Sequence, residues 1–286
     1  MRLATFETKW GPQVGVVNGD SLVPVAAPGL DMIGLIAASR TGLEQARTAS
    51  GPAVALSSVT LLAPIPMPRR NILCVGVNYA AHAAEGAGAR GMPVQVPERP
   101  LFFTKNTTTA NGPHGDIPHD PAVSDQLDWE VELGVVIGQG GKNIPEADAM
   151  RHVFGYLVVN DVSARDAQVG HGGQFFKGKS LDGTCPMGPW IVTADEIADP
   201  HKLGLRCRVN GVVKQDANTE DMMFRLPALI MWLSKGMTLL PGDILATGTP
   251  SGVGFARKPP EFLHPGDVVE CEVDGIGSLR NRVVSV

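Results

Sequence analysis

The chain has 286 residues, of which 43% are apolar, so it can build a sizeable core in one large domain or in one large and one small domain. Its net charge is −5 and no stretch is rich in lysine and arginine, which argues against nucleic acid or an anionic membrane as a partner. Its four cysteines are widely scattered without a Cys-x-x-Cys pair, a pattern that favours reduced thiols in a cytoplasm and disfavours zinc.

Residues 1–66 are predicted to form a small separate unit. They contain no apolar signal core, and no stretch of the chain is long and apolar enough for a membrane span. Two valine-rich runs around an Asn-Gly-Asp turn predict a hairpin over 14–25, and residues 31–48 have the pattern of a helix. Alternating prolines over 61–68 then predict an extended linker and a domain boundary.

Residues 67–286 are predicted to form the main unit, a β-rich α+β domain. A helix is expected near 144–153, and another over 221–234, where apolar residues recur at helical spacing. A polar loop is expected over 111–127. Short strands are predicted at 71–77, 101–105, 129–137, 155–160, 243–247, 267–273 and 279–284. Because strands outnumber helices and do not alternate regularly with them, a doubly wound parallel sheet is disfavoured.

The most informative segment, 128–137, places two glutamates within an otherwise apolar strand. Glu130 and Glu132 are two residues apart, so their side chains share one face of the strand, with Cα atoms about 6.5–7 Å apart. Two like charges beside apolar residues need compensation by protonation, a basic partner or a cation, unless this face is solvated. Asp128 is a candidate third member of the group.

A further carboxylate, Asp161, ends the apolar run 156–160 about 30 residues later. Glu130, Glu132 and Asp161 together make an all-oxygen set without a nearby cysteine or histidine pair. Such a set suits a hard divalent ion, with Mg²⁺ as the first choice and Mn²⁺ or Ca²⁺ as alternatives.

Three other segments carry candidate chemistry. His82 and Glu85 are three residues apart, so on a helix they can hydrogen-bond as a general base and its orienting carboxylate, or else form a solvated face. The glycine-rich stretch 86–91 behind them predicts a flexible, hinged lid. Lys179 could hold a carboxylate or an oxyanion, and loop 247–254 could offer backbone N–H groups to an anionic ligand.

Taken together, these segments resemble the fumarylacetoacetate hydrolase family from about residue 71 to the end of the chain. The matching pieces, in the family's order, are 75–79 followed by His82 and Glu85, then 101–105, 129–133, 160–166, 177–180 and 247–254. The resemblance implies a mixed β-roll catalytic domain over 67–286, preceded by the small N-terminal α+β domain that some members carry. It also implies a homodimer.

The resemblance further implies site roles for named residues. Glu130, Glu132 and Asp161 would hold Mg²⁺ or Mn²⁺, and His82 with Glu85 would form a catalytic dyad on a lid, assisted by Lys179. The residues implied to contact the substrate are Tyr79, Lys105, Arg165, Gln168 and Thr249. One departure is the sequence Leu-Asp-Gly over 181–183, where many members have Phe-Asp-Thr, a change expected to alter the substrate pocket.

The function predicted on this basis is hydrolytic C–C cleavage of a small 2,4-dioxo acid in a reaction of aromatic catabolism. His82, oriented by Glu85, would take a proton from water, Lys179 would steady the oxyanion, and the cation would accept charge on the leaving enolate. Alternatives with the same ion are isomerisation of a 2-hydroxyhepta-2,4-diene-1,7-dioate or 5-carboxymethyl-2-hydroxymuconate type of substrate, and decarboxylation of oxaloacetate. A non-catalytic binding protein that keeps the fold is a third reading.

Overall fold

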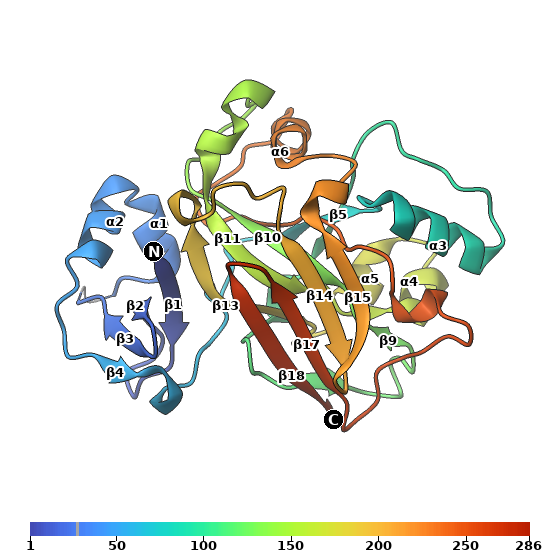
Figure 1. The fold of residues 1–286 in the computed structure, drawn as a ribbon, viewed down its shortest axis with the longest axis horizontal. Helices are drawn as coiled ribbons and strands as arrows, with labels where there is room; N and C mark the ends of the chain where they lie inside the picture. The colour runs from blue at the N-terminus through green and yellow to red at the C-terminus, as the bar shows by residue number, and fades with distance from the viewer. Residues whose placement is uncertain (27–28) are drawn as a thin grey trace.

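The computed structural model describes residues 1–26 and 29–286, and its N-terminal part contains a small set of antiparallel strands (Figure 1). The predicted hairpin is confirmed, with two strands joined by a tight turn at Gly19. The strands of this part are β1 (Arg2–Phe6), β2 (Gln13–Asn18), β3 (Ser21–Pro24) and β4 (Val54–Ala55).

The single helix predicted over 31–48 is wrong, because two helices occupy these residues. They are α1 (Met32–Ala37) and α2 (Arg40–Arg47). The break falls at Ser39, whose φ of 51° lies in the left-handed region and therefore cannot continue a right-handed helix.

A long mixed sheet has the strand order β4-β3-β2-β1-β13-β11-β10-β16-β5-β6, with β7 paired to β13. The N-terminal strands join it where β1 pairs antiparallel with β13, with Leu3 opposite Ile191. Its other strands are β5 (Ile72–Gly76), β6 (Leu101–Lys105), β7 (Ala110–Asn111), β10 (Val131–Ile137), β11 (Val153–Asn160), β13 (Cys185–Thr193) and β16 (Ile244–Ala246). Residues 1–66 thus share a sheet with the rest of the chain, and a domain boundary at residue 66 stays a prediction.

A second, five-stranded sheet has the order β15-β14-β17-β18-β8. Its strands are β8 (Ile117–His119), β14 (Gly204–Val209), β15 (Val212–Asn218), β17 (Val268–Val273) and β18 (Gly277–Ser285), and a separate pair is formed by β9 (Leu127–Asp128) and β12 (Ser163–Ala164). The abundance of strands confirms the predicted β-rich α+β fold.

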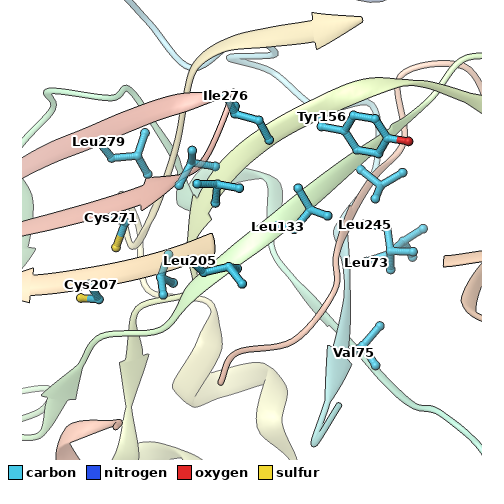
Figure 2. Packing of buried hydrophobic residues seen from close by; sticks show 14 of the residues in the cluster. Leu73, Val75, Leu133, Tyr156, Leu205, Cys207, Leu245, Cys271, Ile276 and Leu279 are labelled. Atoms are coloured by element: carbon cyan, nitrogen blue, oxygen red, sulfur yellow. The ribbon is translucent and has the colours of Figure 1, made fainter. Parts of the chain in front are cut away.

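The main core fills the space between the two sheets (Figure 2). Leu133 and Tyr156 from the long sheet pack in the same cluster as Leu205 and Leu279 from the second sheet. On β10 every residue is buried, since the side chains that point away from this cluster, such as Val136, pack in another core that includes α1. A strand covered on both faces cannot present Glu132 to bulk water.

The helices lie at the periphery of the sheets (Figure 1). The α-helices of the main part are α3 (Ala80–Arg90), α4 (Arg165–Gly170), α5 (Phe175–Lys179) and α6 (Leu226–Ser234). Short 3-10 helices are η1 (Leu56–Ser58), η2 (Thr107–Thr109), η3 (Glu146–His152), η4 (Ala194–Glu196), η5 (Thr219–Asp221) and η6 (Gly254–Ala256). The helix predicted over 221–234 begins later, at Leu226 with a proline in its first turn.

The glycine-rich stretch 86–91, expected to be a flexible hinge, is helical as far as Arg90, and its role in a lid stays a prediction. Helix α3 continues through Gly86 and Gly88 and ends at Arg90, with Gly91 in the left-handed conformation of a helix C-terminus. Gly86 is buried in the face of the helix that meets Phe255, and the alanines around it favour the helix.

All four cysteines are buried free thiols, as expected from their spacing. Within the described residues, no helix combines the length and the apolar character that crossing a bilayer requires.

Helix α6 begins beside a partly buried histidine, which gives stability a predicted dependence on pH. The Leu226 N–H donates to His201 Nε2 at 3.2 Å, and burial lowers the pKa of His201 although Asp199 opposes this. The unfolded chain therefore takes up the proton first, so the free energy of unfolding should fall as pH drops below about 6.5, by up to about 1 kcal/mol, the usual effect of a helix cap. Urea unfolding at pH 8 and pH 5.5 measures this. His201→Gln keeps a hydrogen-bond acceptor but cannot titrate. If this variant lost as much stability at pH 5.5 as the wild type, His201 would not be the cause of the pH dependence.

Candidate active site

The three predicted carboxylates meet at the centre of the long sheet. Glu132 lies on β10, Glu130 directly precedes that strand, and Asp161 directly follows the paired strand β11. The Asp161 N–H donates to the Glu130 carbonyl at 2.9 Å, which fixes the two chain segments side by side. One oxygen from each carboxylate lies within 4.8 Å of the others, and all three residues are buried. The structure therefore brings this triad together as predicted.

Buried cations pair with two members of the triad. Lys179 Nζ lies 2.8 Å from Glu130 Oε2 and 2.7 Å from Asp161 Oδ2, and Lys105 Nζ lies 2.8 Å from Asp161 Oδ1. Arg165 Nη2 lies 2.6 Å from Glu130 Oε1. Burial alone would raise the pKa of Glu130, but Lys179 and Arg165 outweigh it and lower this pKa to about 2. Glu130 is therefore a carboxylate at neutral pH.

Glu132 is the member without a basic partner among residues 1–26 and 29–286. Its Oε2 accepts a hydrogen bond from the Gly248 N–H at 2.7 Å. Burial, followed by the charges of Asp161 and Glu130, raises the pKa of Glu132 well above its usual value. A hard divalent cation would remove this penalty, and the three converging oxygen ligands fit such an ion.

His82 and Glu85 form the predicted pair on α3. His82 Nδ1 lies 2.8 Å from Glu85 Oε1, and Glu85 Oε2 accepts from the Gly252 N–H at 2.8 Å. Because a carboxylate can only accept, Nδ1 carries the proton and Nε2 is left as the basic nitrogen. His82 lines the same pocket as Glu130 and Lys179.

This pocket has a volume of about 360 Å³ and contains most of the predicted substrate contacts. Arg165, Gln168, Lys179 and Thr249 all line it. The apolar part of the wall includes three aromatic rings that the sequence did not single out, Phe103, Phe175 and Phe255.

Tyr79 and Lys105 are buried behind the pocket wall and do not line it. The Tyr79 hydroxyl makes no hydrogen bond with the described residues, and Lys105 binds Asp161 and the Val162 carbonyl. A direct role of these two residues with substrate stays a prediction.

Loop 247–254 directs its N–H groups at the protein's own carboxylates. Gly248 donates to Glu132, Gly252 to Glu85, and Gly254 to Asp128 at 2.6 Å. Gly248 has a φ of +97°, and a Cβ there would lie 2.8 Å from Asn78 Cβ, so this position needs glycine. These three N–H groups are therefore used by side chains of the protein itself, and the prediction that the loop serves an anionic ligand stays a prediction for the rest of the loop, including Thr249, which lines the pocket.

Asp128 is not part of the triad and instead positions Arg165. One carboxylate oxygen accepts from Arg165 Nε at 2.8 Å, and both accept backbone N–H groups, including those of Gly254 and Phe255. The spacing Asp-x-Glu suggested that Asp128 joins the other two acids. It failed because sequence spacing does not show which buried cation each acid contacts.

Asp128→Asn is expected to lower the free energy of unfolding by about 3 kcal/mol, because it leaves a buried arginine partly unpaired. The amide group would also face the Phe255 N–H, a donor, in one of its orientations. Urea unfolding measures the loss. A decrease below 1 kcal/mol would show that Glu130 alone holds Arg165.

The departure at 181–183 lies outside the pocket lining. Asp182 Oδ1 accepts from the Thr108 hydroxyl at 2.5 Å, and Gly183 has a φ of +69°. Glycine suits this left-handed conformation better than the threonine of other family members would. Because residues 181–183 do not line the pocket, this departure does not change the pocket through direct contact with a ligand.

The mixed sheet, the buried acidic triad and the His82–Glu85 pair together match the class of enzyme that the fumarylacetoacetate hydrolase fold defines. A family model described as "Fumarylacetoacetate (FAA) hydrolase C-terminal" matches residues 71–284, and the chain belongs to this family.

Similar proteins are named as enzymes of this superfamily. The chain is 46% identical over 295 residues to "Oxaloacetate tautomerase Fahd2a, mitochondrial" of Rattus norvegicus, covering 99% of this chain and 92% of the relative. It is 52% identical over 230 residues to "Oxaloacetate tautomerase YisK" of Bacillus subtilis, covering 80% and 74%. The solved fumarylacetoacetate hydrolase of Exiguobacterium antarcticum matches over 100% of both chains, with a TM-score of 0.86 and 37% identity.

Proposed function

We propose that this protein is a divalent-metal-dependent tautomerase of a small 2-oxo acid of the oxaloacetate class. The observation that carries the proposal is the basic His82 Nε2 in a pocket whose wall also holds Glu130 and Lys179. The near full-length similarity to the rat protein named as an oxaloacetate tautomerase supports the same reaction.

Keto–enol exchange moves one proton between carbon 3 and the oxygen on carbon 2. In this proposal His82 Nε2 takes the proton from carbon 3, the electron pair forms the C2–C3 double bond, and the imidazolium returns the proton to the oxygen. Glu85 keeps the ring in the required orientation and stabilises the imidazolium. Lys179 stabilises the negative charge that develops on the oxygen.

The metal site is proposed to be Glu130, Glu132 and Asp161. A divalent cation there, with Mg²⁺ as the first choice, would supply Lewis-acid stabilisation to the 2-oxo acid. Arg165 keeps Glu130 ionised, and Gly248 fixes the Glu132 carboxylate in place for this task.

The test is a stopped-flow assay of the enol absorbance of oxaloacetate, with the protein loaded with Mg²⁺ and with the protein stripped by a chelator. The proposal expects fast relaxation only with the ion. Full activity in a stripped sample whose metal content is verified would reject the metal-dependent mechanism.

A second candidate is the hydrolytic C–C cleavage expected from the sequence. Its support is the similarity to the Exiguobacterium enzyme and to the maleylpyruvate hydrolase of Sphingobium sp. SYK-6, which has a TM-score of 0.80 and 32% identity. The same dyad would then deprotonate a water instead of carbon 3. Acetylpyruvate separates the two, because hydrolysis releases pyruvate and acetate, whereas tautomerisation releases neither.

Assays with two further substrates test the isomerase and decarboxylase alternatives. A 2-hydroxymuconate-type dienol tests isomerisation, which the similarity to the 2-hydroxyhepta-2,4-diene-1,7-dioate isomerase of Mycobacterium marinum supports. Release of pyruvate and CO₂ from oxaloacetate tests decarboxylation. A homodimer and a cytoplasmic location are also proposed, and sedimentation analysis and cell fractionation test them.

A further inference from the structure

The pocket wall carries one cation that the catalytic groups do not use. Arg90, in the last turn of α3, lines the pocket together with Arg165 and Lys179. Arg165 and Lys179 are each held by buried carboxylates. In the part of the chain that the structure describes, no carboxylate pairs with Arg90.

Arg90 is exposed to solvent where it lines the pocket, and no side chain of the described residues holds its guanidinium by a hydrogen bond or an ion pair. Its guanidinium carbon lies 5.2 Å from the centre of the Phe255 ring, and neighbouring parts of the lining are Met92, Pro93 and Val96. Partial burial of this solvent-exposed side chain, and then the charge of Arg165, lower the pKa of Arg90. An anion bound by the Arg90 guanidinium would offset both effects.

The position of Arg90 relative to the triad suggests which anion this is. Arg165 also lies against the Phe255 ring, at 4.6 Å from its centre, so a single aromatic side chain links the triad's arginine to Arg90. Figure 1 shows α3 at the same end of the molecule as α4 and α5, which carry Arg165 and Lys179. A ligand whose 2-oxo acid end faces Glu130 and Lys179 therefore extends toward Arg90.

We infer that Arg90 is the binding site for the second carboxylate of a short dicarboxylic 2-oxo acid, and that it selects dicarboxylates over monocarboxylates. This inference rests on the proposed function for the reacting end of the substrate. The subsite itself depends only on an unpaired guanidinium facing the pocket, whose planar pair of N–H donors suits a carboxylate.

The test compares Arg90→Gln and Arg90→Lys with Arg99→Gln as the matched control. Arg99 lies in the segment that follows α3, is stacked on Trp232 and is outside the pocket lining, so its replacement removes the same charge without touching the site. Arg90→Gln should raise KM for oxaloacetate about 10- to 100-fold, the usual effect of losing a hydrogen bond to a charged group, with a smaller rise for Arg90→Lys. KM for acetylpyruvate, which has no second carboxylate, should change less than about threefold.

A binding measurement separates this inference from the proposed reaction. Malate and lactate differ by the distal carboxylate, and calorimetry with each should show that the wild type prefers malate and that Arg90→Gln loses the preference. If Arg90→Gln lost the preference for malate but the wild type had no tautomerase activity, the proposed reaction would be rejected and the carboxylate subsite would stand. An unchanged malate-to-lactate ratio and an unchanged KM for oxaloacetate would overturn the inference, leaving Arg90 as a helix-terminal charge only.

Discussion

Replacing Glu132 with glutamine is expected to weaken divalent-ion binding at least 100-fold and to abolish most turnover. Loss of even an outer-shell partner costs metal affinity about 10- to 100-fold, and Glu132 would be a direct ligand. The ion-free variant should nevertheless be as stable as the ion-free wild type or more stable. The reason is that the mutation removes a buried carboxyl whose ionised form is disfavoured by burial and by the charges of Asp161 and Glu130.

Titration calorimetry with Mn²⁺ and urea unfolding of the ion-free proteins measure the two effects. Asp243→Asn is the matched control, because Asp243 is also a buried carboxylate but is paired with Arg70, away from the triad. This control should lose stability and keep its ion affinity. If Glu132→Gln instead retained wild-type Mn²⁺ affinity, the triad would not be the ion site.

His82→Ala is expected to lower kcat by a factor of about 10²–10⁴, the usual contribution of a general acid–base group. Ion affinity should be almost unchanged, since His82 is not one of the three clustered carboxylates. Glu85→Gln should cause a smaller loss, because the ring remains but no longer has a carboxylate to fix its proton on Nδ1.

The matched control is His152→Ala, in which the removed ring binds the Gln139 carbonyl outside the pocket. Steady-state kinetics with saturating Mg²⁺ compare the variants. Wild-type kcat in His82→Ala would mean that another group, such as Lys179, moves the proton.

Alternation along one strand was sufficient to predict the triad, but not how its charge is compensated. Glu130 and Glu132 share a face as expected, and the solvated-face reading is excluded because both side chains and every residue of β10 are buried. The sequence around each acid does not show which acid pairs with a basic side chain. Lys179 meets Glu130 across 49 positions of sequence, and Gly248 meets Glu132 across 116.

Several elements escaped prediction for physical reasons. Strand β13 contains Pro186 and the Gly188–Pro189 pair, which normally argue against a strand, yet its pairing with β11 and β1 maintains it. Strand β14 had a usable signal that was missed, because buried Leu205 and Cys207 alternate with arginines. The role of Arg90 also left no local signal, since only the end of α3 brings it to the pocket.

Loop 247–254 has a consequence for how this chain can change. Connecting loops usually tolerate insertions, but this loop is largely buried, and its N–H groups at positions 248, 252 and 254 hold Glu132, Glu85 and Asp128. Adding or deleting one residue would shift all three contacts out of register at once. Natural or designed variants of this protein should therefore keep the length of this loop constant.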